Sequence, residues 1–84
     1  MKAVLLKGHG GLERLVIEDV AAPSPQAGEV LVRVRASGVR HHDVLARQGH
    51  FPRTKLPGII GHEIACEVAE LGAGVSGFRA GDRV

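Results

Sequence analysis

The sequence has almost no aromatic residues: its 84 residues include two phenylalanines, Phe51 and Phe78, and no tyrosine or tryptophan. The core must therefore be built from valine, leucine, isoleucine and alanine, a composition that favours short strands over a large helical core. A chain of this length makes at most one small domain, residues 1–84, which buries only about 60% of its unfolded surface.

Cysteine and long apolar runs are also scarce. Cys66 is the single cysteine, so no disulfide can form within the chain and a reducing compartment is the simplest setting. The first apolar run stops at Lys7, too early for the core of a signal peptide, and no later run approaches the length of a membrane span. We expect a cytoplasmic protein with no membrane segment.

Charge of one sign is not concentrated anywhere. The formal net charge is +2, and the lysines and arginines form no run. A nucleic-acid-binding surface would need clustered basic residues and usually aromatic side chains for stacking on bases. The sequence therefore predicts no nucleic-acid partner.

Apolar residues in several stretches alternate with the period of strands. Residues 2–7 predict a strand before a glycine-rich turn, and residues 12–20 a second strand whose apolar face holds Leu15, Ile17 and Val20. In residues 29–36 the alternation predicts a buried face of three valines, and residues 64–71 predict a fourth strand. Residues 41–48 predict a short helix that ends at Gly49. The expected fold is mainly β, a small β-barrel with one short helix.

The glycines of residues 72–77 formally match a dinucleotide-binding fingerprint after a strand. That fingerprint needs a helix after its last glycine, because the helix N-terminus holds the pyrophosphate. Another glycine and a turn signal follow here instead, so we interpret the stretch as tight turns. The last residues, 81–84, have the pattern of the start of a further strand, which indicates a fragment of a longer chain.

The residues that could bind a metal or transfer a proton lie in two short segments. One segment holds His41, His42 and Asp43, and the other holds His62 and Glu63. Neutral imidazole is a common zinc ligand, and a carboxylate beside it can tune the metal. The spacing alone favours a capped strand end without metal, because two residues do not make a zinc site. Adjacent histidines on a helical turn point in different directions, so we do not expect both His41 and His42 to coordinate one ion.

Four motifs in order resemble the N-terminal part of the zinc-dependent alcohol dehydrogenases, in the medium-chain dehydrogenase/reductase superfamily. They are residues 23–30 (PSPQAGEV), 38–43 (GVRHHD), 56–63 (LPGIIGHE) and 71–84 (LGAGV followed by GDRV). The resemblance covers essentially the whole chain. It implies part of a GroES-like β-barrel catalytic domain, paired in the family with a Rossmann domain that binds NAD or NADP. The implied reaction is hydride transfer between an alcohol and an aldehyde or ketone, with zinc polarising the substrate oxygen.

The resemblance also implies roles for single residues. His62 matches a zinc ligand, Glu63 the carboxylate next to the metal, and Asp43 the aspartate that orients the ligand histidine. His41 matches a basic residue near the cofactor pyrophosphate. His42 stands where the family has a hydroxyl that passes the alcohol proton outward, a role that an imidazole can also fill.

Arg40 departs from the family, which has a zinc-binding cysteine at this position. A guanidinium stays protonated and offers no lone pair to a metal. Three interpretations follow, in this order: part of a zinc alcohol dehydrogenase with a variant residue at position 40, a zinc-free reductase of the quinone oxidoreductase type, and a non-catalytic barrel module. We expect the 84 residues alone to be inactive, and a longer parent protein to form a homodimer or homotetramer.

Overall fold

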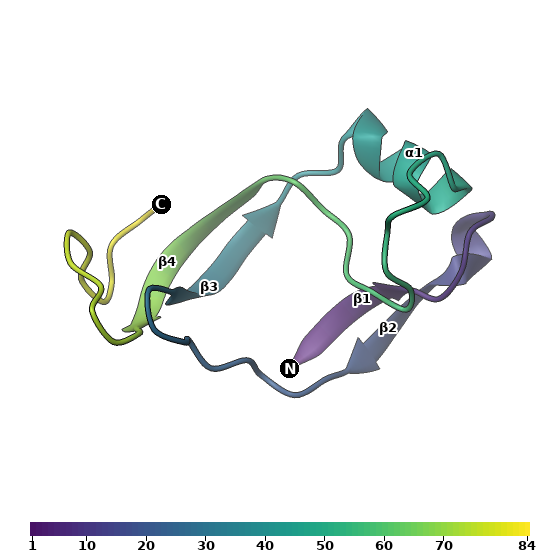
Figure 1. The fold of residues 1–84 in the computed structure, drawn as a ribbon. Helices are drawn as coiled ribbons and strands as arrows, with labels where there is room; N and C mark the ends of the chain where they lie inside the picture. The colour runs from purple at the N-terminus through teal and green to yellow at the C-terminus, as the bar shows by residue number, and fades with distance from the viewer. The chain divides into compact units, whose positions relative to one another are not determined.

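The structure is a computed structural model that describes residues 1–84. Its strands are β1 (Lys2–Leu6), β2 (Leu15–Asp19), β3 (Val30–Ser37) and β4 (Ile64–Leu71), and its helix is α1 (His41–Gln48) (Figure 1). A 3-10 turn, Leu12–Arg14, precedes β2. The strands form two antiparallel two-stranded sheets, and neither sheet closes on itself. The expectation of a mainly β, partial barrel with one short helix is confirmed.

The chain forms two compact units, each assembled from two separate segments. The first unit consists of residues 1–21 and 38–62, and the second of residues 22–37 and 63–84. The first therefore contains β1, β2 and α1, and the second contains β3 and β4. No helix has the length and apolar character needed to cross a lipid bilayer.

The first unit is built on the β1–β2 hairpin, whose register runs from Lys2 opposite Asp19 to Leu6 opposite Leu15. Leu6 is fully buried, and its backbone exchanges two hydrogen bonds with Gly58 at 2.8 and 3.1 Å. The long loop after α1 is thus tied to the end of β1. This contact fixes the position of Gly58, four residues before His62.

The strand predicted over residues 12–20 begins later than expected, because Leu12–Arg14 form the 3-10 turn. Its predicted apolar face is wrong at one position: Ile17 is 70% exposed, whereas Leu15 and Val20 are half-buried. A sheet of two strands leaves the outer part of each face in solvent unless another layer covers it. Alternation along the sequence therefore identified the strand but not the depth of its side chains.

The second unit is built on β3 and β4, whose register runs from Val30 opposite Leu71 to Ser37 opposite Ile64. The buried core consists of Cys66 and Val68 on β4. The predicted valine face of β3 is only partly correct, because Val34 is 52% exposed. The ladder shifts register beside Val34, and such an irregularity turns the following side chains away from strict alternation.

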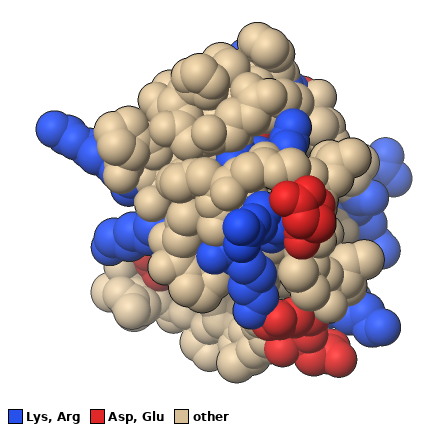
Figure 2. Space-filling view, turned by 90° about the vertical axis from the view of Figure 1, so that its right-hand side faces the viewer, with Lys and Arg blue, Asp and Glu red and all other residues tan.

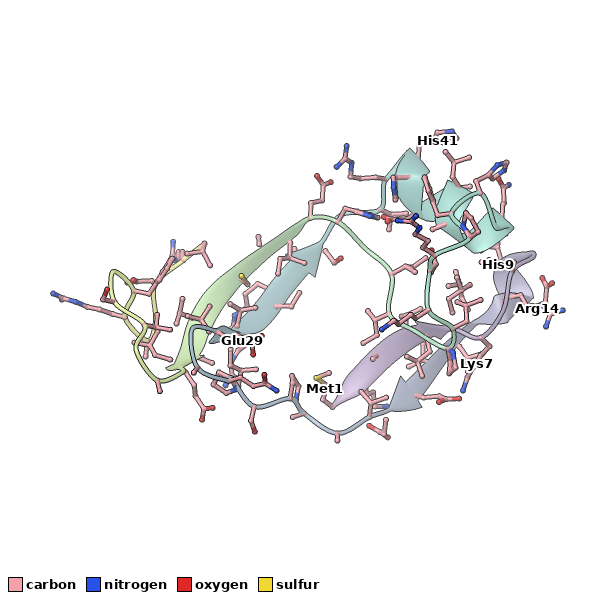
Figure 3. All side chains as sticks on the ribbon, in the orientation of Figure 1. Met1, Lys7, His9, Arg14, Glu29 and His41 are labelled. Carbon is pink, nitrogen blue, oxygen red and sulfur yellow. The ribbon has the colours of Figure 1, made fainter.

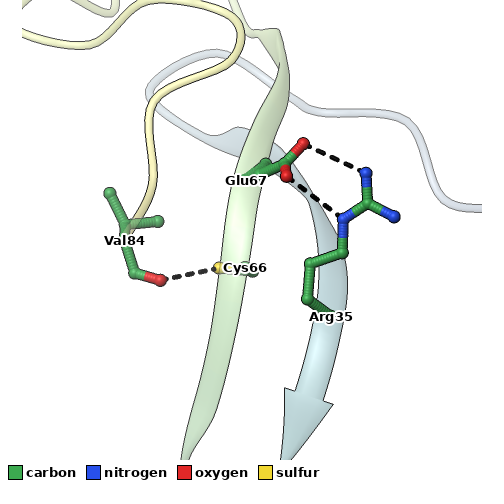
Figure 4. A network of polar contacts seen from close by, with 4 residues as sticks. All are labelled: Arg35, Cys66, Glu67 and Val84. Atoms are coloured by element: carbon green, nitrogen blue, oxygen red, sulfur yellow. Dashed lines mark hydrogen bonds and ion pairs between the residues drawn. The ribbon is translucent and has the colours of Figure 1, made fainter.

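The C-terminal residues lie along the free edge of β4. Cys66 and Val84 exchange backbone hydrogen bonds of 2.9 Å in both directions, and the Val68 N–H donates to the Asp82 carbonyl at 2.8 Å. Residues 81–84 thus pair as the sequence suggested for the start of another strand. The buried thiol of Cys66 also donates to the Val84 carbonyl at 3.5 Å (Figure 4).

The charged side chains are mixed over the surface. On the face seen in Figure 2, lysine and arginine side chains stand in separate groups beside acidic ones and are interrupted by uncharged residues. In the first unit, Lys7 pairs with Glu18 at 2.7 Å. Lys7 follows the end of β1, and its charge compensates that of Glu18 on β2 locally, although exposed pairs of this kind contribute little to stability.

The turn over residues 8–11 braces helix α1 from its C-terminal end. The Gly10 N–H donates to the Arg47 carbonyl at 2.9 Å, and the Arg47 guanidinium donates to the Gly10 carbonyl at 2.6 Å. His9 lies beside the end of the helix (Figure 3), so close to Gly49 that a Cβ at Gly49 would come within 3.2 Å of the imidazole. Helix α1 is therefore fixed in position within its unit.

The glycine-rich stretch after β4 forms turns, as the sequence predicted, and no helix follows Gly77. Gly74, Gly77 and Gly81 all have positive φ. At Gly72 the constraint is space: a Cβ there would overlap the Gln26 carbonyl oxygen and lie 2.7 Å from that of Glu29.

We expect Gly72→Ala to lower the free energy of unfolding by about 1–3 kcal/mol, because backbone atoms rather than flexible side chains would have to move. The urea midpoint measures this change. Gly8→Ala is the matched control, since its Cβ would meet Arg14 at an ordinary 3.7 Å. Equal midpoints for the two variants would show that the close approach of backbone atoms at Gly72 does not affect stability.

Arg35 and Glu67 form the ion pair of the second unit, with two hydrogen bonds of 3.2 Å each between the guanidinium and the carboxylate (Figure 4). These hydrogen bonds, and then the charge of Arg35, lower the pKa of Glu67 from its ordinary value of 4.5. A carboxyl group whose pKa is lower in the folded state stabilises the fold above its unfolded pKa, and the stabilisation is lost as the pH falls through the folded pKa.

The difference in unfolding free energy between the native chain and Glu67→Gln should therefore be constant near neutral pH and shrink below about pH 4.5. Chemical denaturation at a series of pH values measures it. Glu70→Gln, at an exposed position of the same strand, provides the comparison. A difference that does not change between pH 7 and pH 3 would show that the ion pair with Arg35 does not lower the pKa of Glu67.

Candidate metal centre

The site begins where β3 has ended and helix α1 starts. Arg40 is extended (φ −106°, ψ 163°) and precedes the first helical turn, and its carbonyl accepts the Asp43 N–H at 3.0 Å. The Asp43 carboxylate accepts the Arg40 N–H through Oδ2 at 2.9 Å. The helix ends at Gly49, whose left-handed conformation (φ 97°) suits a residue without a side chain. The predicted helix, residues 41–48, is confirmed.

Asp43 is the buried charged residue of the chain, with 7% of its surface exposed. Besides the Arg40 N–H on Oδ2, its Oδ1 makes a 2.8 Å hydrogen bond with Nδ1 of His62. The hydrogen bond from Arg40 is the main cause that lowers the pKa of Asp43; burial acts in the opposite direction, and His62 lowers the pKa further. Asp43 is therefore a carboxylate at neutral pH, and both of its oxygens are engaged.

The contact with Asp43 sets the tautomer of His62. An ionised carboxylate can only accept hydrogen bonds, so Nδ1 of His62 carries the proton in their 2.8 Å contact. The lone pair of the neutral ring is then on Nε2. The side chain of His62 is 40% exposed, which leaves it accessible to a ligand. A histidine oriented in this way by a carboxylate is the usual form of a metal-binding imidazole.

The ring of His42 lies between two other rings. It stacks on Phe51 with centroids 4.1 Å apart and planes at 14°, and it meets His62 edge-on with centroids 3.8 Å apart. Its Nδ1 is buried and has no hydrogen-bond partner. The motifs in the sequence do not point to Phe51, although it is one of only two aromatic residues in the chain, and that scarcity was an available signal.

The structure brings three of the expected site residues together. One nitrogen of His42, one nitrogen of His62 and one oxygen of Asp43 all lie within 4.8 Å of one another. Two of the expected residues are not in this group. His41 is exposed on the first turn of α1 and points away from the helix (Figure 3). Glu63 is exposed and belongs to the second unit, so its role beside a metal stays a prediction.

Imidazole nitrogens and carboxylate oxygens are donors that zinc accepts, so the chemistry of the cluster suits this ion. His62 offers Nε2, and the orphaned nitrogen of His42 shows that its ring has unused bonding capacity. Arg40 is the one mismatch: its backbone N–H holds Asp43, and its guanidinium offers no lone pair. The donor types in this cluster therefore suit a zinc ion, and His62 is the residue whose geometry presents a lone pair.

We expect Asp43→Ala to abolish the preference of His62 for the Nδ1-protonated tautomer, because the acceptor of that proton is removed. Nitrogen-15 chemical shifts of the imidazole at neutral pH measure the tautomer. Asp19→Ala, which removes an exposed carboxylate of the same unit, should leave the His62 ring unchanged. A tautomer that persists in Asp43→Ala would mean that another group holds His62.

Known proteins share this arrangement of elements. The family described as the Alcohol dehydrogenase GroES-like domain matches residues 26–84. Over the whole chain, 46% of residues are identical to the acryloyl-coenzyme A reductase of Metallosphaera sedula, and the chain spans 25% of that protein. The NAD-dependent alcohol dehydrogenase of Sulfolobus acidocaldarius is 44% identical, again over the whole chain and 26% of the relative.

Among solved structures, that of AibC superposes on 99% of the chain with a TM-score of 0.95 and 49% identity, and the chain covers 23% of it. The chain thus spans about a quarter of the length of these relatives. The two proteins from Metallosphaera sedula and Sulfolobus acidocaldarius are both named as oxidoreductases but for different substrates. With a family match over most of its length, the chain belongs to the Alcohol dehydrogenase GroES-like domain family, within the medium-chain dehydrogenase/reductase superfamily.

Proposed function

We propose that this chain is the N-terminal portion of the catalytic domain of an NAD(P)-dependent zinc alcohol dehydrogenase. The reaction is hydride transfer between an alcohol and an aldehyde or ketone. The observation that carries the proposal is the 2.8 Å contact between Asp43 and His62. A buried, ionised carboxylate that fixes one tautomer of an accessible imidazole is an arrangement for presenting a lone pair.

Zinc at this site would act as a Lewis acid that polarises the substrate oxygen and makes loss of the alcohol proton possible near neutral pH. The chain's own contribution is to present Nε2 of His62 and to keep Asp43 charged behind it. Glu63 follows His62 directly and, in this proposal, supplies a further carboxylate near the metal. Removal of Asp43 would loosen His62, and losses of about 10–100-fold in metal affinity or activity are typical of such supporting residues.

His41 is the proposed contact with NAD or NADP. It is exposed at the first residue of α1, where backbone N–H groups without helical partners and the helix dipole favour an anion such as a pyrophosphate. The chain itself has no helix after its glycine-rich turns that could hold a dinucleotide. The cofactor would therefore be bound mainly by other parts of a longer protein, and the 84 residues alone should not turn over substrate.

A zinc-free reductase is the second candidate, and Arg40 favours it, because the position offers no metal donor. One relative is named for reducing acryloyl-coenzyme A, a compound whose carbon–carbon double bond is conjugated with a thioester carbonyl. Such a double bond accepts hydride without a metal. The two candidates differ in one testable respect: only the zinc enzyme should lose activity to a chelator.

A chimera tests the proposal. Residues 1–84 would replace the matching segment of the NAD-dependent alcohol dehydrogenase of Sulfolobus acidocaldarius. We expect the chimera to oxidise alcohols with NAD, and Asp43→Asn in the chimera to lower kcat/KM by about 10–100-fold. Cofactor reduction followed at 340 nm provides the measurement.

The matched control is Asp19→Asn, which makes the same change at an exposed carboxylate of the first unit and should leave kcat/KM unchanged. Reduction of an activated double bond that a chelator does not affect, without alcohol oxidation, would support the zinc-free candidate instead. A folded chimera that binds NAD but catalyses neither reaction would contradict both.

A further inference from the structure

The orphaned nitrogen of His42 is the feature that the proposed function leaves unexplained. Nδ1 is buried and has no partner, although nearly all buried polar atoms of folded proteins are hydrogen-bonded. A proton relay through His42 would need a hydrogen-bond partner at each ring nitrogen, one to deliver a proton and one to accept it, and Nδ1 has none. An unpaired buried nitrogen destabilises the fold unless a ligand satisfies it.

We propose that His42 is a metal ligand, and that together with His62 it replaces the donor that Arg40 cannot supply. The inference rests on the proposed zinc site and changes its ligands. Where the family has a cysteine thiolate at position 40, this chain would use the imidazole at position 42. It also gives His42 a different role from the proton relay that its position in the sequence suggests.

The distances permit this donor pair. Two imidazole nitrogens on a tetrahedral zinc, each about 2.05 Å from the ion, lie about 3.4 Å apart. One ring nitrogen of His42 and one ring nitrogen of His62 lie within 4.8 Å of each other. The two rings are therefore near enough for one nitrogen of each to reach the same ion.

The surroundings of His42 also favour a ligand. Its ring is stacked on Phe51 at an interplanar angle of 14°, so its orientation is set before a metal arrives and little rotamer freedom remains to be lost. The neighbouring His41 has no such support and is exposed. Of the two adjacent histidines, the structure places one in the cluster and one in solvent.

The charge of the site follows from the exchange of donors. Two neutral imidazoles in place of an imidazole and a thiolate leave the site with one more positive charge, and the Asp43 carboxylate behind His62 offsets part of it. Nitrogen donors suit divalent ions such as zinc, copper and nickel, whereas thiolates favour softer metals. The proposed ligand class is therefore a borderline divalent cation, with zinc as the probe.

Zinc titration of the 84-residue chain, followed by nitrogen-15 NMR of the imidazoles, tests the inference. We expect the ring nitrogens of His42 and His62 to shift together and to saturate at one zinc per chain. His42→Phe keeps a ring on Phe51 but removes the donor, and it should weaken zinc binding at least tenfold. His41→Phe, the same substitution at the adjacent exposed position, should change the affinity less than twofold.

Unchanged zinc affinity in His42→Phe, a shift of His62 alone, or a folded native chain that binds no zinc would each overturn the inference. Dispersion of the backbone amide signals shows that each variant is folded, and the same titration of the chimera gives the result in a larger protein. The two proposals fail separately. Loss of zinc in His42→Phe with no alcohol oxidation by the chimera would overturn only the proposed function, and alcohol oxidation with normal zinc binding in His42→Phe would overturn only this inference.

Discussion

The carboxylate of Asp43 is the group on which the candidate site depends. It is buried and ionised, and each of its oxygens has one partner: the backbone N–H that opens helix α1 and the imidazole of His62. The same side chain therefore stabilises the start of a helix and orients a possible metal ligand 19 residues further along the chain. The start of the helix and the orientation of His62 are therefore coupled, because both depend on the charge of the same carboxylate.

The position of that carboxylate is in turn fixed by the packing of α1. Arg47 and Gly10 exchange two hydrogen bonds at the far end of the helix, and Gly58 binds the backbone of Leu6. These contacts are made by turns rather than by a large core, since only four apolar residues are buried. A chain with so little buried apolar surface gains much of its order from backbone hydrogen bonds and tight glycine turns.

Arg40 illustrates how a substitution can spare a fold and still change a site. Its structural task uses only the backbone N–H, which every residue except proline possesses, so the helix starts normally and Asp43 keeps its place. Its chemical task, if the position once held a metal donor, would use the side chain, and a guanidinium cannot perform it. The ring of His42, stacked on Phe51 and edge-on to His62, carries a buried nitrogen that has no hydrogen-bond partner.

The sequence by itself determined the elements: the strand periods, the helix between Gly38 and Gly49 and the glycine turns follow from local backbone preferences, and the order of motifs identified the family. It also named the three residues of the cluster. Only the tertiary structure decided that His42 and not His41 lies beside His62, that Phe51 holds the ring, and that Ile17 and Val34 are exposed. Those outcomes depend on contacts between distant segments and on a register shift, which periodicity along the chain does not encode.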